Sequence, residues 1–216
     1  IALHSNIGKK KTFCFKERIK DINPNCVVDT YDIFYSEENK DIPFARHIDY
    51  VIDCCDSLES KKILITECFR RNIPIISSMG TGNKFHPELF KIDRLKKTEY
   101  DPLAKKLRYL LKDNKSLLET MVVYSREIPQ EYKGKIGSIS YVPSVAGLLI
   151  TSYVINKFLE GKIEKSSYFI WLIHIFMVIS LMFEPRIQTA LKRLETRNCT
   201  LRASELFKRR KYESSN

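Results

Sequence analysis

The chain has 216 residues, 44% of them hydrophobic, which allows one domain of moderate size with a sizeable core, or one domain plus a tail. Its formal net charge of +11 indicates either a soluble basic surface or an acidic partner such as RNA or an anionic membrane. The six cysteines form no Cys-x-x-Cys pair and do not support a zinc ribbon. The thiols are interpreted as small buried hydrophobes in a reducing cytoplasm. No N-terminal signal peptide is visible.

The first part of the chain predicts a helix, a strand and a connecting segment. Residues 9–22 favour a helix, which Asn23-Pro24-Asn25 ends. Residues 26–35 are rich in Val, Tyr, Ile and Phe and predict a strand. Residues 41–48 predict a short helix or a loop.

Three segments between residues 50 and 78 predict a βαβ unit. Residues 50–54 form an apolar run broken only by Asp53, as expected for a strand covered on both faces. Residues 60–71 predict a basic amphipathic helix, and residues 73–78 predict a second strand that leads into a glycine-bearing turn. This alternation indicates a mostly parallel sheet with right-handed crossovers.

The pattern changes after residue 82. The expected elements are, in order, a strand at 89–95, a basic helix at 102–112, a short strand at 121–124, a polar loop at 127–136, a strand at 137–141 and a long apolar helix at 143–159.

The βαβ unit places two carboxylates where ligands commonly bind. Asp53 and Asp56 lie at the carboxyl end of its first strand, the end at which open α/β sheets bind their ligands. A carboxylate there can hold a magnesium ion against the phosphates of a nucleotide. The structural alternatives are that Asp53, inside the strand, accepts hydrogen bonds, and that Asp56 caps the following helix.

The last fifty residues have an unusual composition. Residues 168–183 contain one histidine and no charged side chain. Since a transmembrane helix needs about 20 apolar residues, this short run predicts either a membrane contact or a buried segment. The basic tail at 192–216 has no obvious core and predicts at most a loose helix.

Six groups of residues, in this order and spacing, resemble one family over roughly residues 1–160. They are Gly8-Lys-Lys-Lys11 with Arg18 and Ile22-Asn-Pro24, Tyr50-Val-Ile-Asp-Cys-Cys-Asp-Ser57, Ser78-Met-Gly-Thr-Gly82, Asp101-Pro-Leu-Ala-Lys-Lys-Leu-Arg108, Val123-Tyr-Ser-Arg-Glu127 and Gly137-Ser-Ile-Ser-Tyr-Val-Pro-Ser-Val-Ala-Gly147. The chain thereby resembles the adenylating enzymes related to ubiquitin activation, the ThiF, MoeB and HesA group. The fourth and sixth groups are similar to the branch that dehydrates threonylcarbamoyladenosine in tRNA, and they distinguish it from the sulfur-carrier branches.

This resemblance implies an enzyme that binds ATP and magnesium on a Rossmann-like, mostly parallel sheet with flanking helices. Such an enzyme adenylates a carboxylate, here the threonine carboxylate beside the tRNA anticodon, and loss of AMP then gives a cyclic product. It further implies a cytoplasmic protein, usually a homodimer, with tRNA as its partner. We therefore expect an α/β nucleotide-binding domain at residues 1–160, followed by an apolar segment and a basic tail at 161–216.

The resemblance also assigns roles to individual residues. Lys11 matches the family lysine that contacts the ATP phosphates, although the residue alone would suggest only a solvated helix face. Asp56, in Asp-x-x-Asp-Ser, matches the catalytic, magnesium-linked aspartate. Ser57 is grouped with the cofactor-binding residues, and Arg18 is expected to be structural.

A basic cluster around the predicted helix at 102–112 has two interpretations. It comprises Lys96, Lys97, Lys105, Lys106 and Arg108. The cluster is either a solvated helix face or, with tRNA as the implied substrate, a surface that contacts phosphates.

Parts of the family pattern have no match here. The glycine-rich loop G-x-G-G-V-G-S, the acidic strand end that holds the ribose and the Asn-Arg-Gln after it are absent. The chain is therefore expected to start after these elements, as a truncated domain that can be inactive on its own, because the loop supplies the backbone N–H donors for the phosphates.

The family pattern differs at a second place as well. Residues 121–125 lack the cysteine that several relatives use for a thioester. Two alternatives remain beside the tRNA enzyme: an adenylyltransferase for a ubiquitin-like sulfur-carrier protein, and a non-catalytic binding remnant.

Overall fold

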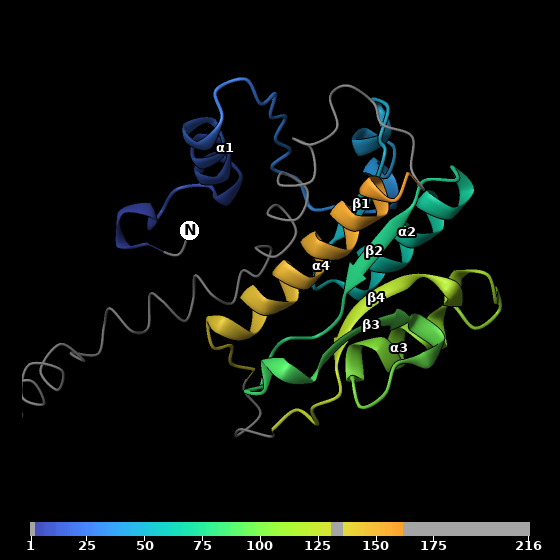
Figure 1. Ribbon diagram of the computed structural model, residues 1–216. Coiled ribbons are helices and arrows are strands. Elements are labelled where there is room, and N and C mark those ends of the chain that lie inside the picture. Colours follow the sequence, from blue (N-terminus) through green and yellow to red (C-terminus); the bar gives the residue numbers. More distant parts are fainter. Residues whose placement is uncertain (1–2, 131–135, 162–216) are drawn as a thin grey trace, which may run out of the picture. The chain divides into compact units, whose positions relative to one another are not determined.

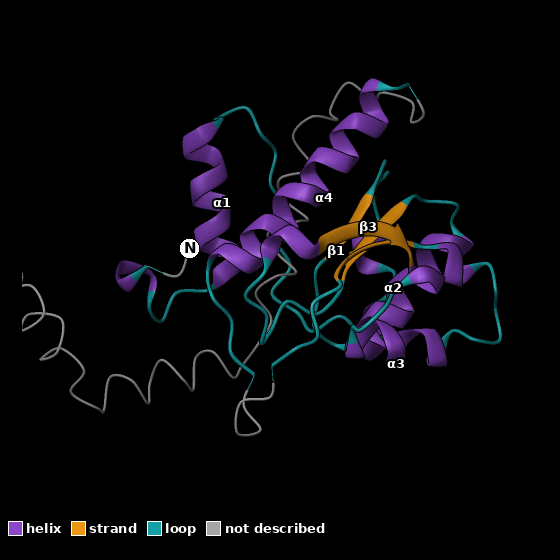
Figure 2. Cartoon of the chain, turned by 60° about the horizontal axis from the view of Figure 1, so that its bottom comes forward, coloured by secondary structure: helices purple, strands orange, loops and turns teal. Residues whose placement is uncertain are grey.

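The computed structural model describes residues 3–130 and 136–161 and contains a four-stranded sheet with helices on both faces (Figures 1 and 2). The strands lie in the order β1-β2-β4-β3. Their bounds are Val51–Asp53 for β1, Ile75–Ser78 for β2, Phe90–Arg94 for β3 and Met121–Ser125 for β4. The α-helices are α1 at Lys11–Ile22, α2 at Leu58–Arg70, α3 at Pro102–Leu110 and α4 at Tyr141–Leu159.

Strands β1, β2 and β4 are parallel, and β3 runs antiparallel at the edge. In register, Ile52 lies opposite Ile76 and Ser77 lies opposite Val122. All three residues of β1 are buried, as the continuous apolar run predicts for a strand covered on both faces. The mostly parallel sheet predicted from the sequence is confirmed.

One face of the sheet is covered by α4 (Figure 2). Its residues at four-residue spacing, which share one side of a helix, are buried against the sheet: Val142, Ala146, Ile150, Val154 and Phe158. The opposite face is covered by α2 and α3, with Leu107 of α3 and Ile65 of α2 packed in one core together with Val122 of β4. The sheet therefore lies between two separate apolar layers.

The starts of α2 and α3 follow local capping rules. Ser57 caps α2, because its hydroxyl accepts a hydrogen bond from the backbone N–H of Ser60 at 3.2 Å. Asp101 caps α3 by accepting from the N–H of Ala104 at 2.9 Å, and Pro102 occupies the first helical position, where no backbone donor is needed. These caps fix where the connecting loops end.

Two predicted strands are absent. Residues 26–35 are not a strand, because this segment makes no ladder with another strand; its side chains instead form local ion pairs, such as Asp29 with Arg46 at 2.7 Å. Residues 137–141 are also not a strand. There the N–H of Gly137 donates to the side chain of Asn83 at 2.7 Å, and the chain then turns directly into α4.

Within the described residues, α4 is long and apolar enough to span a bilayer, with a third of its most apolar stretch buried. Since one side of α4 packs against the sheet, we regard it as a core helix. The predicted membrane contact at residues 168–183 and the basic tail at 192–216 lie outside the described residues.

The packing of α4 predicts different costs for two truncations on the same helix. Ile150 is fully buried and Leu148 is 67% exposed. Ile150→Ala should lower the free energy of unfolding by about 2–5 kcal/mol, because it leaves a cavity against the sheet, whereas Leu148→Ala should change it by less than about 0.5 kcal/mol. Urea denaturation followed by circular dichroism measures both. Equal costs would show that α4 does not pack by the side described here.

Candidate functional site

Two of the predicted ligand-binding residues, Asp56 and Ser57, lie in the loop between β1 and α2, at the carboxyl edge of the sheet. Asp53 ends β1 and is fully buried, while Asp56 is exposed. Ser57, not Asp56, caps α2, so the interpretation of Asp56 as a helix cap is wrong. Asp56 thus projects from the loop without that structural task. Lys11 is the half-buried first residue of α1.

Asp53 is the centre of a buried polar cluster. Its Oδ2 accepts from Nζ of Lys61 at 2.9 Å and from the hydroxyl of Ser77 at 2.5 Å. Its Oδ1 accepts from the backbone N–H of Cys55 at 3.0 Å and from the Cys55 thiol at 2.9 Å. The prediction that Asp53 acts as a structural hydrogen-bond acceptor is confirmed.

The charge of Lys61 is retained in this apolar setting because of Asp53. The side chains of Lys61 and Asp53 are both 0% exposed. Burial alone would lower the pKa of Lys61, but the neighbouring groups, the Asp53 carboxylate foremost, together raise that pKa. The ammonium also donates to the hydroxyl of Ser77 at 3.2 Å. One cation from α2 therefore joins the ends of β1 and β2 and the loop that carries Asp56.

A second buried ion pair holds the loop that follows β2. Nζ of Lys84 donates to Oδ2 of Asp101 and to the carbonyl oxygen of Gly80, each at 2.7 Å. Because the other oxygen of Asp101 caps α3, this one carboxylate connects the loop to the start of the helix. Lys84 and Asp101 are 1% and 0% exposed, so the loop is held from inside the protein.

The same loop has two further anchors. Both carboxylate oxygens of Glu127, just after β4, accept from the backbone N–H of Phe85 at 2.9 Å, and one accepts from that of His86 at 2.8 Å. Asn83 has a positive φ of 57° and exchanges hydrogen bonds with Gly137. Residues 80–86 are thus held in place beside the carboxyl edge of the sheet by side-chain and backbone hydrogen bonds.

The cysteines near this edge are not nucleophiles. Burial raises the pKa of the Cys54 thiol to about 12 and also raises that of Cys55, with the Asp53 carboxylate adding to it. Both thiols are therefore protonated near neutral pH. Strand β4 contains no cysteine, as the sequence shows, so no thiol is poised there for a thioester.

The described residues contain no group of three or more His, Cys, Asp or Glu side chains arranged to hold a metal ion. A site made only of protein ligands is therefore not present in this part of the chain. A magnesium ion shared with the phosphates of a ligand needs less, since one or two carboxylates are sufficient.

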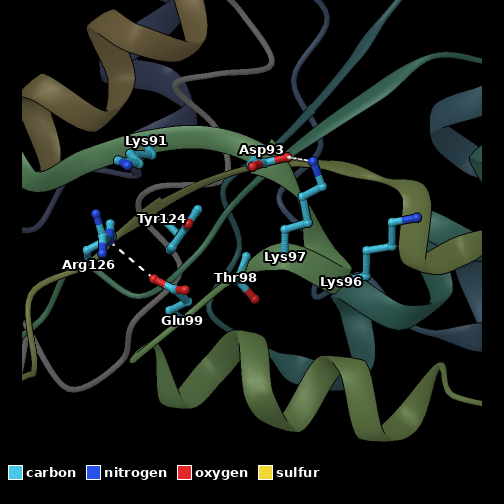
Figure 3. Close-up of a pocket in the computed structure, with 8 residues that line it drawn as sticks. All are labelled: Lys91, Asp93, Lys96, Lys97, Thr98, Glu99, Tyr124 and Arg126. Atoms are coloured by element: carbon cyan, nitrogen blue, oxygen red, sulfur yellow. Dashed lines mark hydrogen bonds and ion pairs between the residues drawn. The ribbon is translucent and has the colours of Figure 1, made fainter.

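The predicted basic cluster divides into three parts. Lys96 and Lys97 lie in the 3-10 helix η5 (Leu95–Lys97) and line a surface hollow beside β3, which we call the β3 hollow (Figure 3). Lys105 and Lys106 are exposed on α3 and do not line it. Arg108 donates to the carbonyl oxygen of Thr98 at 2.9 Å and to its hydroxyl, which ties α3 to the segment before it.

Sequence reasoning missed the roles of Lys61, Lys84 and Glu127. The signal for Lys61 was available: it precedes Leu64 and Cys68 by three and seven residues, which places it on the buried side of α2. A charged residue within an apolar stripe predicts a buried partner. The partners of Lys84 and Glu127 depend on how the loops pack, and no local spacing indicates them.

The fold and this edge site define an adenylating type of protein, and the chain belongs to the ThiF family, which it matches over residues 1–199. The tRNA threonylcarbamoyladenosine dehydratase of Bacillus subtilis is 37% identical over 177 residues, which cover 74% of this chain and 70% of that protein. The structure of the Escherichia coli tRNA N6-threonylcarbamoyladenosine dehydratase in complex with ATP matches with a TM-score of 0.69 at 33% identity, over 74% of this chain and 68% of that one. An adenylyltransferase and sulfurtransferase of Meyerozyma guilliermondii is 34% identical over only 93 residues, covering 42% of this chain and 22% of that protein.

The Asp53–Lys61 pair can be tested with a double-mutant cycle of unfolding free energies. Lys61→Met should lower the free energy of unfolding by about 3–5 kcal/mol, because it leaves the Asp53 carboxylate buried without a countercharge. The double variant Lys61→Met/Asp53→Asn should be more stable than Lys61→Met alone, since the amide is neutral and still accepts the Cys55 N–H. Urea denaturation of the wild type, both single variants and the double variant gives the coupling. Additive costs would mean that the two side chains do not act as a pair.

Proposed function

We propose that this chain belongs to an enzyme that cyclises threonylcarbamoyladenosine in tRNA by ATP-dependent dehydration. The observation that carries the proposal is the carboxyl edge of the sheet, where Asp56 projects from a loop held by the buried Asp53–Lys61 pair. Support comes from the dehydratases of the same family, one of them solved with ATP.

The chemistry suits such a site. A carboxylate is a poor electrophile until one of its oxygens becomes part of a good leaving group, and transfer of the adenylyl group of ATP to that oxygen, with release of pyrophosphate, achieves this. An internal nucleophile of the modified nucleoside then attacks the activated carbon and releases AMP. Both steps depend on holding the two reactants together and on stabilising phosphate charge, which a rigid edge can provide.

Three residues carry the proposed nucleotide contacts. Asp56 would hold a magnesium ion, which would offset the negative charge of the phosphates, and Lys11 would contact the phosphates directly. Ser57 would act through its cap, which fixes the first turn of α2; the backbone N–H groups there favour an anion. A magnesium ion fits the residues present, because it retains several waters and needs one or two carboxylates beside the phosphates.

The main competing function is the adenylation of a ubiquitin-like sulfur-carrier protein. It is less well supported, because β4 lacks a cysteine and the thiols of Cys54 and Cys55 stay protonated. The similarity to the Meyerozyma protein also covers less than half of this chain. A non-catalytic binding remnant is the outcome to which a failed nucleotide test would point.

The proposed reaction implies tRNA as partner and a cytoplasmic location, and the resemblance to the family implies a homodimer. The candidate RNA-contacting residues from the sequence are Lys96, Lys97, Lys105, Lys106 and Arg108. A membrane contact through residues 168–183 remains a separate hypothesis, which binding to vesicles would test.

Calorimetric titration with ATP and magnesium tests the nucleotide site. The chain lacks the glycine-rich loop of the family, so the titration should be done on this chain and on a chimera that carries the N-terminal segment of the Bacillus subtilis relative before Ile1. We expect magnesium-dependent ATP binding by the chimera, with weaker or no binding by the chain alone. Absence of binding in both forms would favour the non-catalytic remnant.

The variant Asp56→Asn should lose catalytic activity while keeping its fold. The rate of magnesium-dependent adenylation, measured by pyrophosphate exchange in the active form, should fall by about a hundredfold or more, because the carboxylate that holds the metal is gone. Glu59→Gln is the matched control: it removes an exposed carboxylate three residues away, in the first turn of α2. An unchanged rate in Asp56→Asn, or an equal loss in Glu59→Gln, would refute the assigned role.

A further inference from the structure

The β3 hollow is a concave, charged surface outside the nucleotide site (Figure 3). It has a volume of about 590 Å³ and lies between the edge strand β3, the end of β4 and the segment before α3. Its cationic lining residues are Lys91, Lys96, Lys97 and Arg126. Asp93 and Glu99 are its acidic ones, and Glu119, which lies outside the lining, pairs with Lys96 at 2.5 Å, so these four cations face three carboxylates.

The cations differ in how strongly they are neutralised. Arg126 pairs with Glu99 at 3.2 Å and Lys97 with Asp93 at 3.8 Å, and all four side chains are substantially exposed. Lys91 is exposed and forms no ion pair with any residue of the described part of the chain. Exposed ion pairs contribute little free energy, so an incoming anion can compete for Lys97 and Arg126 as well as for Lys91.

The floor of the hollow favours contact with a phosphate backbone over stacking on bases. Tyr124 of β4 lies opposite Lys91 of β3 in the ladder and is 3% exposed. Its ring is packed in the core with Leu107 of α3 and offers no face for a base. Contacts to phosphates position a nucleic acid without reading its sequence.

On these grounds, and resting on the proposed function, we propose that the β3 hollow binds phosphates of the RNA substrate, with Lys91, Lys97 and Arg126 as the contacting cations. This moves the centre of RNA contact from α3 to the edge of the sheet. Arg108 is left out, because its guanidinium is held by Thr98. The three cations come from separate segments, Lys91 from β3, Lys97 from η5 and Arg126 from the residue after β4, which favours several phosphates of a chain over a single one.

The lining also distinguishes RNA from a lipid surface. No exposed apolar side chain lines the hollow, whereas stable attachment to a bilayer needs buried apolar area in addition to charge. A flat bilayer would also leave a concave surface partly unfilled. An anionic vesicle therefore serves as the competing probe.

Fluorescence anisotropy with a labelled tRNA transcript, in the absence of ATP and over a range of salt concentrations, tests the proposal on the whole chain. In Lys91→Gln/Lys97→Gln/Arg126→Gln the slope of log affinity against log salt should shrink by about 2 to 3, at about 0.7–0.9 per phosphate contact. Affinity at 0.1 M salt should fall on the order of tenfold or more.

The control variant is Lys20→Gln/Arg46→Gln/Lys62→Gln. It removes the same charge and matches the test set residue by residue: Lys20 is exposed with no ion pair among the described residues, Arg46 pairs with Asp29, and Lys62 pairs with Glu59. We expect this variant to keep the slope and affinity of the wild type. Equal losses in both triple variants would overturn the proposal in favour of diffuse attraction to net charge.

Further measurements cover the case in which the triple variant does not fold and distinguish RNA from a lipid surface. If the triple variant does not fold by circular dichroism, Lys91→Gln alone must reduce the slope by about 0.7–0.9. Phosphatidylserine vesicles should bind the wild type and the triple variant equally, and a loss of vesicle binding in the triple variant with RNA binding unchanged would overturn the proposal. Pyrophosphate exchange is measured separately. If the triple variant keeps its RNA affinity while the protein is an active dehydratase, only the β3 hollow is refuted. If adenylation is absent while RNA still binds, only the nucleotide site is refuted.

Discussion

The buried ion pair between Asp53 and Lys61 is the interaction on which the candidate site depends. Removing two charges from water costs several kcal/mol per ion, and an apolar pair of similar volume is often as stable or more so. The pair is therefore better understood through its geometry: it fixes the ends of β1 and β2 and the first residues after β1 relative to each other. The position of Asp56 is therefore set by the Asp53–Lys61 pair, which is buried from solvent.

The loop after β2 is held by the same physical means. Lys84 and Asp101 form a second buried pair, and Glu127 adds a carboxylate that two backbone N–H groups approach. In each case a charged side chain of one element satisfies groups of another, so an error in packing would leave a buried charge without a partner. The carboxyl edge is thus formed by loops, yet it has the rigidity of the regular elements beneath it.

The sequence predicts those features that depend on local pattern. The βαβ unit from β1 to β2 and the helices α3 and α4 follow from apolar runs and periodicity, and the inward role of Asp53 follows from its place inside an apolar strand. Residues 26–35 mislead because strand propensity has no effect without a neighbouring strand to pair with. The Lys84–Asp101 pair joins residues 17 positions apart, and the β3 hollow joins two strands and a turn. Only the tertiary packing brings these groups together.

The position of β3 has a consequence for the behaviour of the protein at high concentration. Within the described part of the chain, β3 pairs only with β4, so one row of its backbone donors and acceptors is available to another strand. Such edges template aggregation unless the sequence opposes it, and lysines on the edge are a common protection. Lys91, Asp93 and Arg94 place three charged side chains on β3, and pairing this edge with another strand would remove part of their hydration. Lys91, one of the three cations that we propose for RNA, would thereby also help to keep copies of this sheet apart.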